Sequence, residues 1–206
     1  MKNRRLSKLI KVSLLSVMGF LLMYIELPLP LFPDFLKIDV SDLPALLGAF
    51  ALGPVEGVII ELMKNILKGL FGTQTAFVGE TANFLVGSVM VFTAGLIYRK
   101  NKSRKSAIAG LTIGTVIMSV VAAIGNLYIF LPLYEKVLHI PLVAFVEMAQ
   151  KINPAITNIN TYIIWAIIPF NLIKGVFVSA ITVAVYKSVS PILHKENIKK
   201  KLVNNN

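Results

Sequence analysis

Residues 77–98 read FVGETANFLVGSVMVFTAGLIY, an apolar run long enough to cross a bilayer as a helix. The run nevertheless carries Glu80 and Asn83 near its start. A charged side chain at the centre of a bilayer costs roughly 2.5–3.5 kcal/mol on insertion scales. Polar residues in such a run are therefore expected to be secluded in the protein, paired with each other or bound to a ligand.

Further polar groups occur inside three other apolar runs: Glu61 with Lys64 and Asn65, Asn126, and Asn171 with Lys174. The helical rise of 1.5 Å per residue places most of these groups, with Glu80 and Asn83, in the outer half of the bilayer. This shared depth favours a ligand cavity that is open to the outside. The alternatives are an ion pair between Glu61 and Lys64, an ion pair between Glu80 and Lys174, and amide hydrogen bonds between helices.

Composition identifies an integral membrane protein, since 56% of the 206 residues are hydrophobic and 15% are charged, against about 25% charged in soluble domains. The net charge of +11 comes largely from three basic clusters that border apolar runs. Such clusters are typical of cytoplasmic loops and ends, and they argue against a nucleic-acid patch. The clusters are Lys2, Arg4, Arg5, Lys8 and Lys11; Arg99, Lys100, Lys102, Arg104 and Lys105; and Lys187, Lys195, Lys199, Lys200 and Lys201.

The predicted fold is an all-α membrane bundle that forms a single domain, with both termini in the cytoplasm. Six helices give an even number of crossings, which places all three basic clusters on one side. The second helix is short against the roughly 20 residues of a full span. The predicted helices cover about residues 8–25, 42–52, 54–71, 77–98, 106–131 and 160–187.

Two ordered external loops are predicted, over residues 26–41 and 132–159. The first reads ELPLPLFPDFLKIDVS, in which three prolines prevent a helix and residues 35–40 alternate as a short strand does. Long loops above a bundle can act as lids or selectivity elements, or can be solvated connectors.

Small residues recur at helical spacing in the first two predicted helices. Such rows allow helices to approach closely, either inside the subunit or against another membrane subunit. They are Ser13, Ser16 and Gly19, and Ala45, Ala49 and Gly53.

Catalytic and energy-coupling motifs are missing from the sequence. It has no Walker A phosphate loop, no cysteine and no set of histidines that would hold a metal, so neither an enzyme nor a metal site is expected. A binding subunit powered by a partner fits best. One rival is an ion-coupled carrier of another aromatic metabolite that uses Glu80 or Glu61, and another is a purely structural membrane subunit.

Three stretches of the chain resemble the riboflavin-specific substrate-binding (S) component of energy-coupling factor (ECF) vitamin transporters. They are ELPLPLFPDFLKIDVSDLPALLGAFALGPVEGVIIELMKNIL (26–67), VGETANFLVG (78–87) and PFNLIKGVFVSAITVAVYK (169–187). The resemblance covers about residues 8–193. It implies a multi-pass protein of a prokaryotic cell membrane that contacts lipid and assembles with a transmembrane coupling subunit and two cytoplasmic ATPases.

The resemblance also implies where the ligand and the partner bind. Riboflavin, which is the transported ligand and not a cofactor, is expected among the last three helices and the two external loops. The small-residue rows of the first helices are then expected to meet the coupling subunit. The assigned substrate-binding residues are Glu80, Asn83, Asn126, Asn171, Lys174, Leu36, Asp39 and Tyr128.

Overall fold

The computed structural model describes residues 2–203, and the side chains of residues 5–186. Two basic clusters contain residues whose side chains lie outside the described part, namely Lys2, Arg4 and the cluster from Lys187 to Lys201. The helices and strands are α1 (Lys2–Leu22), β1 (Leu27–Pro28), β2 (Lys37–Ile38), α2 (Asp42–Ala51), α3 (Pro54–Gly72), α4 (Val78–Lys100), α5 (Arg104–Gly125), the π-helix η1 (Asn126–Phe130), α6 (Leu131–Leu138), α7 (Leu142–Gln150), α8 (Ile159–Tyr162), the π-helix η2 (Ile163–Ile167) and α9 (Ile168–Val203).

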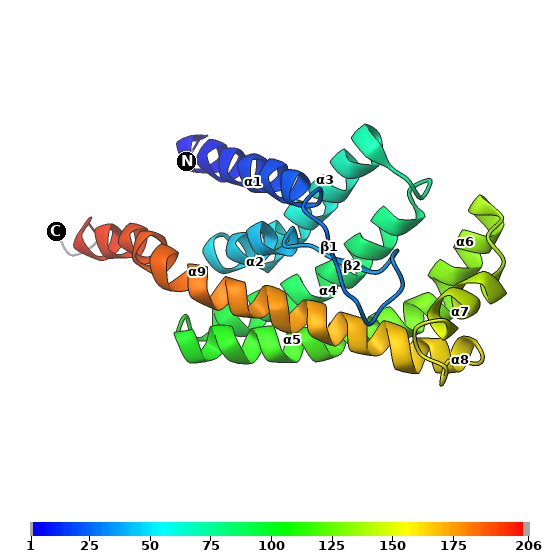
Figure 1. Ribbon diagram of the computed structural model, residues 1–206. Coiled ribbons are helices and arrows are strands. Elements are labelled where there is room, and N and C mark those ends of the chain that lie inside the picture. The colour runs from blue at the N-terminus through cyan, green and yellow to red at the C-terminus, as the bar shows by residue number, and fades with distance from the viewer. Residues whose placement is uncertain (1, 204–206) are drawn as a thin grey trace.

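The segments that carry the basic clusters lie at one end of the bundle. The start of α1, the turn between α4 and α5, and the end of α9 lie on the left in Figure 1, whereas α6, α7 and α8 lie on the right. The three segments therefore share one end of the bundle, and the side of the membrane that this end faces stays a prediction.

Three stretches of the described chain are long and apolar enough to cross a membrane: Val78–Lys100, Arg104–Leu138 and Ile159–Tyr186. Helix α2 has only 10 residues, so the prediction of a short second helix is confirmed. Helix α3 matches its predicted bounds but carries four charged residues, of which Glu61 and Lys64 are buried. Its charges must therefore be compensated inside the protein.

The second predicted external loop, over residues 132–159, is largely helical in the structure. The helix that begins at Arg104 continues through η1 and α6 to Leu138, and α7 follows after a short turn. Pro132 does not end the helix; it comes just after the π-helical turn η1, and such local π geometry is one way in which a membrane helix accommodates a proline. The break comes later, at His139, whose φ of 55° is left-handed.

The segment 26–41 forms a small hairpin that packs on the bundle. Strands β1 and β2 pair antiparallel, with Leu27 opposite Ile38, so the predicted strand over 35–40 is confirmed as a shorter one. Ile38 and Phe32 are buried against Phe170 of α9, and the two phenyl rings have centroids 5.7 Å apart. The hairpin is thereby held over the start of α9 (Figure 1).

Helix α2 lies at the centre of the bundle, where small residues allow close packing. Ala45 and Ala49 are almost fully buried, and a Cβ added at Gly57 would lie 2.7 Å from the Cβ of Ala49. In α1, Ser16 and Gly19 are also buried, whereas Ser13 is exposed. Most of these small residues are therefore covered by the chain itself in this structure, which matches the internal-packing alternative; of the six, Ser13 is the exposed candidate for docking.

Candidate functional site

Glu80 lies in the first turn of α4 and accepts two hydrogen bonds from threonine hydroxyls. The Thr75 hydroxyl donates to its Oε2 at 2.8 Å, and the Thr73 hydroxyl donates to the same atom at 3.1 Å. The turn that brings these threonines back to Glu80 contains Ala76 and Phe77 in left-handed conformations, with φ of 48° and 69°. The alternative of an ion pair between Glu80 and Lys174 is therefore wrong: local hydroxyl groups hold the Glu80 carboxylate.

Two of the assigned asparagines, Asn126 and Asn171, each bond to their own helix. The Asn126 side-chain amide donates to the carbonyl of Ala122, and that of Asn171 donates to the carbonyl of Ile167, both at 2.8 Å. Each bond uses one hydrogen of the side-chain amide. Among the described residues, no donor reaches the Oδ1 of Asn126 or of Asn171. The alternative of amide hydrogen bonds between helices is not what these side chains form; they bond to their own helix, as short polar side chains in helices commonly do. Each asparagine keeps its Oδ1 for another donor.

Both asparagines lie next to the two π-helical turns. Asn126 begins η1, and Asn171 follows η2 by one helical turn. A π-turn inserts a residue into the helix and widens it locally, and such turns often occur at functional sites. Sequence periodicity does not reveal them because the flanking residues remain helical.

Lys174 is held by two carboxylates, Asp39 of the hairpin segment and Asp42 at the start of α2. Its Nζ lies 3.4 Å from Oδ2 of Asp39 and 3.6 Å from Oδ2 of Asp42. Its side chain is 11% exposed. The structure thus brings together two assigned residues, Asp39 and Lys174, and adds Asp42, which the sequence analysis did not select.

Lys64 of α3 is joined to Lys174 through the Asp42 carboxylate, which both lysines contact. Its ammonium group forms ion pairs with Asp42 and, at 2.9 Å, with Glu61, and donates to the Ser41 hydroxyl at 2.8 Å. The predicted pair between Glu61 and Lys64 is confirmed. It is not isolated, however, because Asp42 joins it to Lys174. We call the five side chains Asp39, Asp42, Glu61, Lys64 and Lys174 the buried charge network.

The remaining assigned residues occupy different surroundings. Leu36 is partly buried and packs against both the hairpin cluster and the cluster around α7, and Asn83 is partly buried on α4. Tyr128 is 71% exposed, so its assigned contact stays a prediction.

Three aromatic residues that were not among the assigned ones pack together where the hairpin segment, α6 and α7 meet. The Phe145 ring of α7 packs against Phe35 of the hairpin segment and Tyr134 of α6, with centroids 5.5 and 5.7 Å apart. Helical periodicity in residues 142–150 was the signal that could have placed Phe145.

Known proteins match almost the whole length of the chain. The family model described as "ECF transporter, substrate-specific component" matches residues 7–186. The chain belongs to this family. It is therefore a binding component of a transporter and not an enzyme.

Two curated relatives and one solved structure support the assignment of the chain to this family. The riboflavin transporter RibU of Staphylococcus aureus is 38% identical over 188 residues, which is 91% of this chain and 93% of the relative. The riboflavin transporter FmnP of Bacillus subtilis is 32% identical, covering 93% of this chain and 96% of the relative. The solved S component of a bacterial ECF transporter has a TM-score of 0.72 and 36% identity, and the match covers 95% of this chain and 100% of that one.

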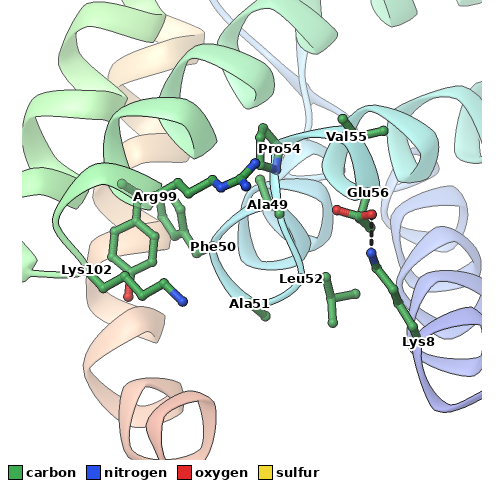
Figure 2. Close-up of a pocket in the computed structure, with 12 residues that line it drawn as sticks. Lys8, Ala49, Phe50, Ala51, Leu52, Pro54, Val55, Glu56, Arg99 and Lys102 are labelled. Atoms are coloured by element: carbon green, nitrogen blue, oxygen red, sulfur yellow. Dashed lines mark ion pairs between the residues drawn. The ribbon is translucent and has the colours of Figure 1, made fainter. Parts of the chain in front are cut away.

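A cavity of about 330 Å³ lies near the turn between α2 and α3, at the end of the component where the basic clusters lie. Ala49, Gly53, Arg99 and Lys102 are among the residues that line it, and the ion pair of Lys8 with Glu56 lies on one side (Figure 2). Gly53 has a φ of 134°, which glycine adopts without strain and which lets the chain turn there. None of the assigned substrate-binding residues lines this cavity, so it is distinct from the candidate substrate site.

Proposed function

We propose that this chain binds riboflavin at the end of the bundle beneath the hairpin, and passes it inward when a coupling subunit and two ATPases are attached. The observation that carries the proposal is the position of Lys174: it lies on α9, 11% exposed, and is held by Asp39 of the hairpin segment. Asn171 lies one turn before it and keeps a free amide oxygen. The names of the relatives support riboflavin as the ligand.

The chemistry of these groups suits an uncharged, flat and polar-edged ligand. Riboflavin has no phosphate, and Lys174 is already balanced by two carboxylates. Lys174 can then donate a hydrogen bond to a ring carbonyl or a ribityl hydroxyl without bringing an uncompensated charge into the membrane. Phe145 and its ring neighbours offer the apolar faces that a tricyclic ring needs.

The membrane arrangement belongs to the same proposal. Six crossings with both termini in the cytoplasm would put the α4–α5 turn inside and the hairpin outside, as the positive-inside rule requires. Riboflavin would then be captured from the outside, with the hairpin closing over it.

A titration of the purified protein with riboflavin tests the proposal directly. Binding is read from quenching of flavin fluorescence, and a yellow extract with a flavin spectrum is expected from cells that contain the vitamin. Lys174→Ala should weaken binding roughly ten- to hundredfold, since a hydrogen bond to a charged group contributes about 1.5–3 kcal/mol. A colourless protein that ignores added riboflavin would overturn the proposal, as would unchanged binding in both Lys174→Ala and Asn126→Ala.

Transport by the chain alone separates this proposal from an ion-coupled carrier. Vesicles that contain only this chain should take up no riboflavin under a proton or sodium gradient. Uptake should require the coupling subunit, the ATPases and ATP.

A further inference from the structure

We propose that Lys64, which lies too deep to touch a ligand, is a positioning residue for substrate binding: it fixes Asp42, and Asp42 with Asp39 fixes the ammonium group of Lys174. This inference rests on the proposed function, because it takes Lys174 as a substrate-binding group. It gives the buried charge network a role in ligand affinity beyond the neutralisation of charge.

The two oxygens of the Asp42 carboxylate face different lysines. Oδ1 contacts Lys64 of α3, and Oδ2 lies 3.6 Å from Lys174 of α9. A carboxylate is planar and rigid, so fixing one of its oxygens also fixes the direction of the other. Asp42 is 1% exposed and has no solvent to replace either contact.

Lys64 itself is not accessible to a ligand. Its ammonium group donates hydrogen bonds to the Ser41 hydroxyl and to Asp42, and it forms an ion pair with Glu61. The side chain is 0% exposed, and its aliphatic part packs against Gly19 of α1, where an added Cβ would lie 3.2 Å from Cδ. An effect of Lys64 on ligand affinity must therefore pass through its neighbours.

Lys174 is held more loosely than Lys64. Its distances to Asp39 and Asp42, 3.4 and 3.6 Å, are longer than an ordinary charged hydrogen bond, and its side chain retains some exposure. The two carboxylates thus set its position while leaving a donor for a ligand. Asp39 is itself oriented by the backbone N–H of Ser41, which donates to its Oδ1 at 2.7 Å. Lys64 reaches both carboxylates, because it bonds to the side chain of Ser41 as well as to Asp42.

The balance of charges in the network indicates how loss of the Lys64 ammonium group would affect Lys174. The network contains three carboxylates and two ammonium groups. Without Lys64, Lys174 is left as the network's one cation, and a buried carboxylate without a partner is costly. Lys174 would then be drawn fully onto Asp42 and away from the ligand.

A double-mutant cycle on riboflavin affinity tests the inference. The proteins are wild type, Lys64→Met, Lys174→Met and the double variant, each first checked for a monodisperse peak in detergent. We expect Lys64→Met to raise the Kd about tenfold or more, and the double variant to bind no more weakly than Lys174→Met. The matched control is Lys68→Met, the same change one turn along α3 at a lysine that packs on the Tyr24 ring. Its Kd should stay within about twofold of wild type, because Lys68 is not one of the five side chains of the buried charge network and substitutions away from buried contacts usually change free energies by no more than about 0.5 kcal/mol.

The outcomes separate this inference from the proposed function. Multiplicative effects in the cycle would mean that Lys64 acts through general structure, and would overturn the inference while the proposed function stands. An unchanged Kd in Lys64→Met would overturn it as well. A wild-type protein that does not bind riboflavin would overturn the proposed function first.

A second pair of variants keeps the test decisive if Lys64→Met does not fold. Asp42→Asn preserves the shape of the side chain, and Ser41→Ala removes one acceptor. Each should weaken binding in the wild-type background and have no further effect in Lys174→Met. Weakening of equal size in both backgrounds would contradict the positioning role.

Discussion

The phenolic oxygens of Tyr98 and Tyr186 lie 2.8 Å apart and share a hydrogen bond that joins α4 to α9 near the end of the bundle where the basic clusters lie. Both residues are buried, and the Phe50 ring of α2 packs against Tyr98 with centroids 4.6 Å apart. Three helices that are distant in sequence therefore meet at one aromatic cluster. Each hydroxyl has the other as its hydrogen-bond partner, so removing one hydroxyl leaves the other without a partner, whereas removing both does not.

Tyr186→Phe is expected to destabilise the protein by about 1–3 kcal/mol, because the buried Tyr98 hydroxyl loses its partner. The double variant Tyr98→Phe/Tyr186→Phe should be closer to wild type, since no hydroxyl is then left unsatisfied. Thermal unfolding in detergent measures both. A double variant that is less stable than Tyr186→Phe would contradict this account.

Gly57→Leu should prevent α2, α3 and α4 from packing as they do. A Cβ at this position would already lie 2.6 Å from Cγ1 of Val91 and 3.0 Å from the carbonyl oxygen of Ala45. Overpacking of this kind typically costs about 1–3 kcal/mol, which should appear as a lower unfolding temperature in detergent. Gly72→Ala is the control, because the added Cβ would meet only the hydroxyl end of the Tyr24 side chain.

Thr75→Val is expected to lower riboflavin affinity several-fold, because Glu80 loses its shorter hydrogen bond and its carboxylate can rotate. Thr75→Ser keeps the hydroxyl and should restore most of the affinity. Fluorescence titration of both variants checks this. Equal affinities in the valine and serine variants would show that the hydroxyl of residue 75 does not orient Glu80 for the ligand.

Much of this organisation follows from local sequence patterns. Glu61 and Lys64 are three residues apart on one helix and so share a face, which the sequence predicts and the structure confirms. Similarly, the three prolines after Glu26 exclude a helix there, and the hairpin forms in that segment. Such features depend only on neighbours along the chain.

The partners of Lys174 could not be read from spacing. Asp39 lies 135 residues before it, and only the packing of the hairpin on α9 brings the two together. Choosing Glu80 as a partner rested on similar depth, but depth does not say which helix faces which. The asparagines show a related limit, because an amide in a helix can bond either to a neighbouring helix or to its own carbonyl four residues back.

The buried face of the hairpin leads to a prediction about the rate of ligand release. Phe32 is 7% exposed and packs against Phe170, whereas the preceding residue, Leu31, is 78% exposed. Phe32→Ala removes this ring contact, and buried Phe→Ala changes cost about 3–5 kcal/mol, most of which would fall on the docking of the hairpin. Riboflavin should therefore dissociate at least roughly tenfold faster, as measured by stopped-flow fluorescence after dilution. Leu31→Ala should leave the dissociation rate nearly unchanged because that side chain faces away from the bundle. If both variants release the ligand at the wild-type rate, the hairpin does not close over the site.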